Sequence, residues 1–204
     1  MNKLINGQNV MRVMRVLKPW LSAIAILLIL RYTGMLSGIS SAAGSAWMKT
    51  GAMDFAPEET AKKSDFDYNF TIQDFQGKKI DFNAYKGKVI FINLWATWCG
   101  PCRMEMPSIQ NLYNTVGTNE KIAFVMLSLD RPETHDKVVK FVSDKQYSFP
   151  VFAPAGNLPR QLQVSTIPTT FIISPDGKIA SKKVGAANYD NDKFRNFLEG
   201  LSEK

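Results

Sequence analysis

Two nearly continuous apolar runs, Val89–Ala96 and Ile122–Leu129, stand out in the middle of the chain. Strands that are covered on both faces have this pattern, so each run predicts a strand inside a sheet. Between the two runs, apolar residues recur at helical spacing at Ile109, Leu112, Tyr113 and Val116. They predict a helix that begins directly after the first strand and ends at Gly117.

Shorter patterns predict elements on either side of this unit. Phe66–Ile72 and Lys79–Phe82, separated by Gly77, favour an opening hairpin, and Pro132–Gln146 favours a helix. The apolar residues of that helix, expected to face inward, are Val138, Val139, Phe141 and Val142. The remaining expected elements are a strand at Phe149–Phe152, two strands at Thr169–Ser174 and Ile179–Val184 joined by the turn Pro175-Asp176-Gly177, and a helix at Asn191–Leu201. This order predicts an α/β fold with a central sheet and helices on both faces.

The first part of the chain has a different pattern. Trp20–Leu30 is an uncharged apolar run, and Arg31 is the single charge in the longer stretch that continues to Trp47. No acidic residue occurs before Asp54, and four cations precede the apolar run, at Lys3, Arg12, Arg15 and Lys18. A basic end followed by an apolar segment is typical of membrane targeting, with the basic end retained in the cytoplasm.

An uncleaved anchor competes here with a cleaved signal peptide. The small residues Ser41–Ala46 would suit a signal peptidase, but they lie more than ten positions beyond Leu30, with Arg31 between. A cleavage site usually follows the apolar core closely, so we expect an anchor. The predicted organisation is a basic cytoplasmic end at 1–18, a transmembrane anchor at 19–40, a linker at 41–63 and a folded domain at 64–204.

The positive charge of the chain is concentrated at this basic end. The formal net charge is +7, but residues 64–204 contain 17 Lys and Arg against 15 Asp and Glu, which leaves the folded part at +2. A nucleic-acid-binding domain needs a basic surface of its own. We therefore expect no nucleic-acid partner.

Cys99 and Cys102 are the only cysteines in the chain, and they open the predicted helix that follows the first strand. At this spacing the second thiol lies one turn on, on the same face, and can close a small disulfide. A helix N-terminus favours the thiolate, which makes Cys99 the predicted nucleophile and Cys102 the resolving thiol. Pro101 is tolerated in a first helical turn. Further along, Arg103 and Glu105 are expected on the exposed face of this helix.

Two other uses of the cysteine pair fit the sequence less well. A static disulfide across so small a loop stabilises little, because the entropy removed from the unfolded chain grows with loop length. A structural zinc ion takes four ligands, and the chain offers the two cysteines and a single histidine, His135. The pattern therefore predicts a redox dithiol with no metal and no cofactor.

Several motifs taken together resemble the thioredoxin family, and within it the TlpA/ResA-like membrane-anchored thiol-disulfide oxidoreductases of bacteria. The resemblance covers about Phe66–Leu201. It rests on Gly87-Lys88-Val89, on the segment Asn93–Arg103 around the cysteines, on Pro107, and on Ile167-Pro168-Thr169-Thr170-Phe171. It implies a thioredoxin-like fold with a central mixed β-sheet flanked by helices.

The resemblance also implies a substrate-binding surface. Pro168, preceded by Ile167, matches the cis proline of the family, where backbone groups receive the substrate chain as a short added strand. Trp98, Gly100 and Pro101 lie beside the nucleophile and are expected to form the rim that contacts the substrate.

The buried proton relay of ordinary thioredoxin is missing from the sequence. Its Asp falls on Asn93 here and its Lys partner on Met126, and neither side chain titrates. A proton acceptor for Cys102 must then be water or another carboxylate. Asp130 and Glu133, at the end of the second strand, are the candidates.

By family analogy, the function is reduction of disulfides in exported proteins, for example in cytochrome c maturation. The partners would be disulfide-containing exported proteins and a membrane electron donor that re-reduces the dithiol. The expected location is the bacterial inner membrane, as a single-pass protein with its catalytic domain outside. A dithiol oxidase and a copper-binding assembly module remain as alternatives. A peroxidase is excluded, because Ala96 occupies the place of the threonine that it would need.

Overall fold

The computed structural model describes residues 18–26, 29, 51, 53–57 and 64–203. The chain forms two units, Met1–Gly44 and Ser45–Lys204. In the first unit, residues 18–26 are helical and exposed. Among the described residues, no helix has both the length and the apolar content that crossing a membrane requires. Most of the anchor predicted at 19–40 lies outside the described residues.

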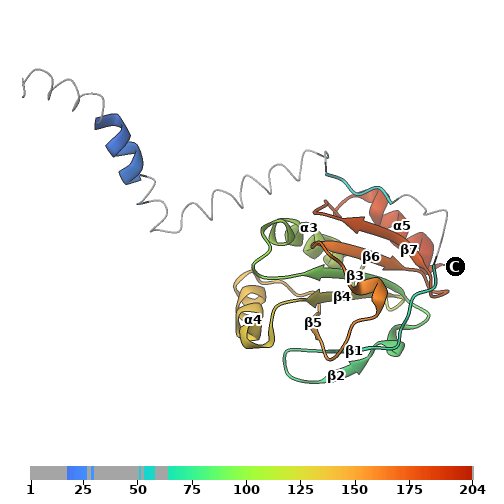
Figure 1. Ribbon diagram of the computed structural model, residues 1–204. Helices are drawn as coiled ribbons and strands as arrows, with labels where there is room; N and C mark the ends of the chain where they lie inside the picture. The colour runs from blue at the N-terminus through green and yellow to red at the C-terminus, as the bar shows by residue number, and fades with distance from the viewer. Residues whose placement is uncertain (1–17, 27–28, 30–50, 52, 58–63, 204) are drawn as a thin grey trace, which may run out of the picture. The chain divides into compact units, whose positions relative to one another are not determined.

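The second unit is built around one seven-stranded sheet with the strand order β2-β1-β5-β4-β3-β6-β7 (Figure 1). The strands are β1 (Thr71–Gln73), β2 (Lys79–Asp81), β3 (Val89–Trp95), β4 (Ile122–Ser128), β5 (Val151–Pro154), β6 (Thr169–Ile173) and β7 (Ile179–Val184). The central strands β3, β4 and β5 are parallel, whereas β6 and β7 on one side and β1 and β2 on the other pair antiparallel. The sheet is therefore mixed, as the resemblance implied.

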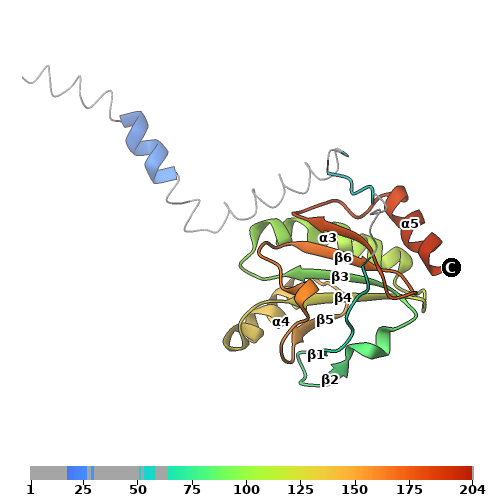
Figure 2. The ribbon, with the colours of Figure 1, turned by 45° about the vertical axis from the view of Figure 1, so that its right-hand side comes forward.

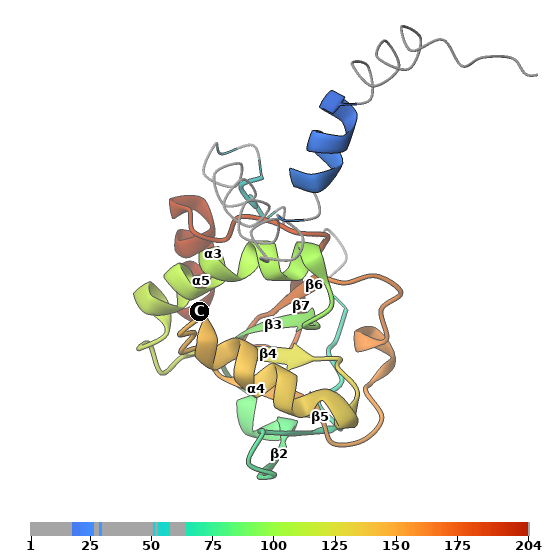
Figure 3. The same ribbon diagram turned by 90° about the vertical axis from the view of Figure 1, so that its left-hand side faces the viewer.

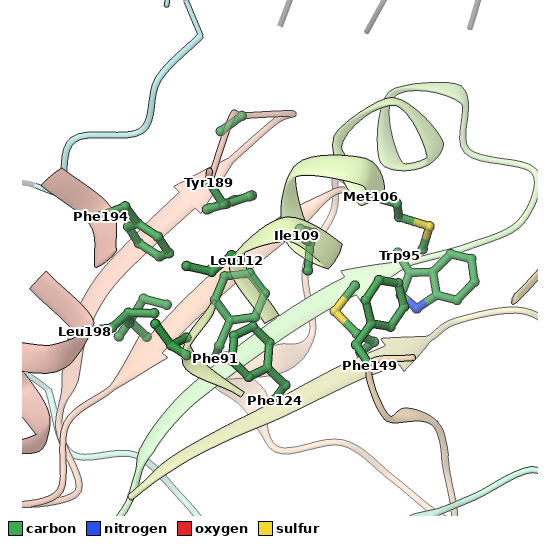
Figure 4. Close-up of a cluster of buried hydrophobic side chains, with 14 of the residues drawn as sticks. Phe91, Trp95, Met106, Ile109, Leu112, Phe124, Phe149, Tyr189, Phe194 and Leu198 are labelled. Carbon is green, nitrogen blue, oxygen red and sulfur yellow. The ribbon is translucent and has the colours of Figure 1, made fainter. Parts of the chain in front are cut away.

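Three α-helices of this unit cover the same face of the sheet. Helix α3 (Gly100–Val116) connects β3 to β4, α4 (His135–Asp144) connects β4 to β5, and α5 (Asp192–Ser202) follows β7. Helices α3 and α5 lie along one side of the sheet in Figure 2, and α4 lies beside β4 and β5 in Figure 3. Side chains from all three helices join one buried cluster, part of which is drawn in Figure 4. Because β3, β4 and β5 follow one another in the same direction across the sheet, right-handed crossovers place α3 and α4 on the same face.

The opposite face carries no α-helix among the described residues. It is covered by the segment Phe66–Phe70 and by two 3-10 helices, η1 (Phe82–Tyr85) and η3 (Arg160–Leu162). The rings of Phe70 and Phe82 stack there at a centroid distance of 4.2 Å. The expected helices on this second face are therefore only these two short 3-10 helices, and aromatic side chains of Phe66–Phe70 cover the rest of it.

Three local predictions also differ from the structure. β1 starts at Thr71 and not at Phe66, because the aromatic side chains before it pack against the sheet while their backbone stays outside it. The predicted helix after β4 begins with a 3-10 turn, η2 (Pro132–Thr134), and becomes α-helical at His135. On α4, Val138 is fully buried, whereas Val139 is 47% exposed and does not face inward as predicted.

The packed domain includes residues that the sequence analysis assigned to the linker. Phe55 lies against Tyr189 and Phe194, with ring centroids 5.8 and 5.4 Å apart. Its backbone amide donates to the carbonyl of Asn188 at 3.0 Å, and the Asn188 side chain donates to the Asp54 carboxylate at 2.6 Å. Asp54 and Phe55 therefore contact the loop between β7 and α5.

We expect Phe55→Ala to lower the free energy of unfolding by about 2 kcal/mol, because it removes a half-buried ring from two aromatic neighbours. Urea unfolding of the full chain measures this change. Phe55→Leu, which keeps much of the apolar area, should lose less than half as much. Equal stability of the alanine variant and the parent protein would show that the segment contributes no packing.

Candidate active site

The two cysteines lie where β3 turns into α3. Cys99 is the N-cap residue of α3, and its sulfur accepts a hydrogen bond from the Cys102 amide at 3.2 Å. Pro101 occupies the first turn, where its missing N–H costs no helical hydrogen bond. Cys99 and Cys102 are joined by a disulfide with a Cα–Cα distance of 5.3 Å. The structure thus shows the oxidised form of the dithiol.

The two sulfurs differ in their access to solvent. Cys102 is fully buried, whereas Cys99 retains 5% exposure and follows Trp98, which is 70% exposed. Cys99 is thus less exposed than its predicted role as a nucleophile suggested. It is still the cysteine that a substrate can reach, which agrees with Cys99 attacking and Cys102 resolving.

The proline segment faces the cysteines from another part of the chain. The Ile167–Pro168 bond is cis, as the resemblance implied, and the carbonyl oxygen of Ile167 lies 3.8 Å from the Cys99 sulfur. Pro168 is buried and Ile167 is half-buried, whereas Gly100 and Pro101, in the first turn of α3, are exposed. Of the predicted rim residues, Ile167 thus contacts the Cys99 sulfur through its carbonyl, and Trp98, Gly100 and Pro101 are exposed on either side of Cys99 in the sequence.

Glu105 is fully buried, so the prediction that it lies on the exposed face of α3 is wrong. One carboxyl oxygen accepts from the Asn93 side-chain amide at 2.8 Å, and the other accepts from the Ala187 backbone amide at 3.1 Å. Burial raises the pKa of Glu105 to about 8, although both hydrogen bonds and the positive charge of Lys183 act to lower it. The fold therefore holds a carboxyl group whose proton affinity is close to that of a thiol.

Glu105 shares the helical spacing of the other buried residues of α3. Cys102, Glu105, Ile109 and Leu112 follow one another at offsets of three or four residues, and all four are buried. Glu105 thus lies one turn after Cys102 on the inner stripe of α3. The sequence analysis missed it because a charged side chain on a helix is exposed in most proteins.

Polar side chains of β3, of β6 and of the loop before α5 form a hydrogen-bonded network around Glu105. The Asn93 amide also donates to the Thr170 hydroxyl at 2.9 Å, and the Tyr189 hydroxyl donates to the same oxygen at 2.7 Å. Burial, followed by the negative charge of Glu105, raises the pKa of Tyr189 well above its ordinary value. Tyr189 therefore stays protonated and Asn93 cannot titrate, which leaves Glu105 as the group in this network that exchanges a proton near neutral pH.

The sequence profile of the AhpC/TSA family matches residues 65–182, more than half of the chain. This chain belongs to the AhpC/TSA family. Thiol-disulfide oxidoreductase ResA of a Bacillus cereus strain is 36% identical over 137 residues, which make up 67% of this chain and 74% of that protein. ResA of Bacillus subtilis (strain 168) is 33% identical over 135 residues, or 64% of this chain and 72% of that protein.

A solved structure agrees with the fold. The crystal structure of a thiol:disulfide interchange protein of the thioredoxin family from Chlorobium tepidum TLS superimposes with a TM-score of 0.57 at 23% identity, covering 70% of this chain and 99% of that one. This AhpC/TSA family member therefore has the thioredoxin-like fold. With its ResA relatives and the disulfide between Cys99 and Cys102, it is a thiol-disulfide oxidoreductase, as the sequence predicted.

The two carboxylates proposed from the sequence as proton acceptors occupy different surroundings in this oxidoreductase. Glu133 is exposed in the 3-10 turn before α4. Asp130 is 6% exposed, and its carboxylate accepts hydrogen bonds from Thr97 and Ser128. Met126, at the position of the lysine partner in thioredoxin, is fully buried.

Glu105→Gln should change how the stability of this oxidoreductase depends on pH. In the unfolded chain the carboxyl group ionises near its ordinary pKa of 4.5, whereas in the fold it keeps its proton until about pH 8. The parent protein therefore loses stability relative to the variant as pH rises through this window, and the difference is constant above it. We expect a change on the order of 4 kcal/mol across the window, measured by urea unfolding of the oxidised proteins.

Glu120→Gln provides the control, since Glu120 is an exposed glutamate in the turn after α3. Its stability should follow that of the parent protein at every pH. Parallel pH profiles for the parent and Glu105→Gln would show that Glu105 titrates as an ordinary surface carboxyl group.

Proposed function

We propose that this oxidoreductase reduces disulfides of exported proteins while tethered to the bacterial inner membrane, with its catalytic domain on the outer side. The tether is supported by the four cations that precede the apolar run Trp20–Leu30. The reducing direction is supported by Gly100-Pro101 between the cysteines, which resembles the reducing members of the thioredoxin family. The observation that carries the catalytic cycle is the buried Glu105 one turn after the buried Cys102.

The cycle begins at the reachable sulfur. In the reduced protein, the Cys99 thiolate attacks one sulfur of the substrate disulfide, and the other substrate sulfur leaves as a thiolate. The Cys102 amide, which donates to the Cys99 sulfur, and the positive end of α3 stabilise the Cys99 thiolate. The product of this step is a mixed disulfide between Cys99 and the substrate.

The second step needs a proton acceptor inside the protein, because Cys102 is closed to solvent. Glu105 in its carboxylate form accepts the Cys102 proton, and the new thiolate attacks the Cys99 sulfur. The second substrate sulfur then leaves as a thiolate, and the Cys99–Cys102 disulfide forms. Two electrons have passed from the dithiol to the substrate. A membrane electron donor must return two electrons, and the proton on Glu105 returns to Cys102.

Substrate recognition would combine backbone and apolar contacts. The segment at Ile167 and Pro168 offers backbone groups to an extended substrate chain, as in the addition of a strand. The exposed ring of Trp98, the residue before Cys99, offers a flat apolar surface. An unfolded exported protein with an accessible disulfide, such as apocytochrome c, matches these requirements.

The equilibrium potential of the Cys99–Cys102 couple tests the direction of electron flow. A reductant should lie near the value of thioredoxin, about −270 mV, and an oxidase near that of DsbA, about −120 mV. We expect a value near the first, measured by equilibration of the full chain with glutathione or dithiothreitol buffers. A value near the second would replace the reductase with the dithiol oxidase.

Cys102→Ser should stop the cycle at the mixed disulfide, because the resolving thiol is missing. We expect adducts on Cys99 that contain exported proteins when the variant is expressed in its native membrane and trapped by acid. The Cys99→Ser, Cys102→Ser double variant controls for nonspecific capture. Adducts that consist of cytoplasmic proteins would contradict the proposed side of the membrane, and a complete absence of Cys99 adducts would contradict protein substrates.

A further inference from the structure

The end of β4 is tied by side chains to the turn that carries Cys99. Asp130 follows Ser128, the last residue of β4, by two positions and is 6% exposed. One oxygen of its carboxylate accepts from the Thr97 amide and from the Ser128 hydroxyl, both at 2.8 Å. The other oxygen accepts from the Thr97 hydroxyl at 2.5 Å. Asp130 thus accepts hydrogen bonds from both the amide and the hydroxyl of Thr97, two positions before the nucleophile.

Backbone hydrogen bonds fix the same turn on either side of Thr97. The Leu129 amide donates to the Trp95 carbonyl at 2.8 Å, which joins the ends of β4 and β3. The Cys99 amide donates to the Ala96 carbonyl at 3.1 Å and closes the turn. Within this arrangement, Asp130 supplies the side-chain contact between β4 and the middle of the turn.

The partners of Asp130 are neutral donors. In the described part of the chain, no ion pair includes Asp130. Its carboxylate accepts three hydrogen bonds, a number that uses much of its capacity as an acceptor. A buried carboxylate whose oxygens accept from neutral donors of two segments suits a structural role, because it joins those segments.

We propose that Asp130 is a positioning residue for thiol-disulfide exchange. Through Thr97 it sets the position of the Cys99 sulfur, 3.2 Å from the Cys102 amide and 3.8 Å from the Ile167 carbonyl. Stabilisation of the thiolate by an amide depends steeply on distance and angle, so a displaced turn weakens it. The inference rests on the proposed exchange at Cys99 but holds for either direction of electron flow, and it differs from the role of proton acceptor.

Three variants separate positioning from proton transfer. Asp130→Asn has the same shape: its oxygen can accept from the Thr97 amide, and its amide can donate to the Thr97 hydroxyl, but it cannot take up a proton. Asp130→Ala removes all three bonds and leaves the Thr97 amide without its partner. Thr97→Val removes the hydroxyl alone and keeps the amide. Glu120→Gln serves as the surface control for loss of a carboxylate.

The measurements are the rate at which each reduced full-length variant reacts with a small disulfide, and the pKa of the Cys99 thiol from the absorbance of its thiolate. For Asp130→Ala we expect a higher thiol pKa and a rate that is lower by about tenfold. Asp130→Asn should stay within about threefold of the parent protein, and Thr97→Val should fall between the two. Glu120→Gln should match the parent protein.

Each other outcome has a distinct meaning. If Asp130→Asn is as slow as Asp130→Ala, the charge or proton uptake of Asp130 is required, and positioning is wrong. If Asp130→Ala matches the parent protein in rate and thiol pKa, the hydrogen bonds of Asp130 have no effect on Cys99, and positioning is again wrong. Should Asp130→Ala fail to fold, the comparison of Asp130→Asn with Thr97→Val still decides, since positioning requires Thr97→Val to be the slower. A parent protein that reacts with no disulfide would contradict the proposed function and not this inference alone.

Discussion

The hydrogen bond from the Cys102 amide to the Cys99 sulfur is the contact on which the chemistry of this protein depends. It places the nucleophile at the N-terminus of α3, where free amides and the helix dipole favour a thiolate. That position exists because β3 ends in the core and the chain must turn into α3 at once. The end of β4 supports this turn through Leu129 and Asp130.

Glu105 shows how the same packing makes an unusual carboxyl group. Burying an ionisable side chain destabilises the fold at any pH where the unfolded chain would ionise. The Asn93 and Ala187 donors recover part of this cost, but the pKa stays near 8. A proton acceptor for a buried thiol needs this match in proton affinity, so in the proposed cycle the burial that lowers stability also suits Glu105 to accept the Cys102 proton.

The loop between β7 and α5 contacts both Glu105 and the segment at Asp54 and Phe55. Ala187 donates to Glu105, and the next residue, Asn188, bonds to both Asp54 and Phe55. The ring of Phe55 then packs on Tyr189, whose hydroxyl binds in the network around Glu105. Phe55 thus packs on a residue that bonds within the network around Glu105. Packing near the start of the domain therefore bears on Glu105, which lies far from it in sequence.

Periodicity in the sequence determined the elements that bury apolar side chains along their whole length. The runs Val89–Ala96 and Ile122–Leu129 became β3 and β4 nearly residue for residue, and the spacing of Cys99 and Cys102 predicted the redox pair. Such patterns are local, since a buried strand or a helix start needs only neighbouring residues to be recognised.

The tertiary structure alone decided which polar groups belong to the site. The sequence treated Glu105 as exposed, but its partner Ala187 lies 82 residues further along the chain, and Asp130 acquires its role from Thr97, 33 residues before it. A charged residue can be buried only where donors converge on it, and those donors come from segments that meet when the sheet forms. The sequence by itself therefore determined the two long central strands, the start of α3 and the reactive pair, and packing between distant segments decided the surroundings of Glu105 and Asp130.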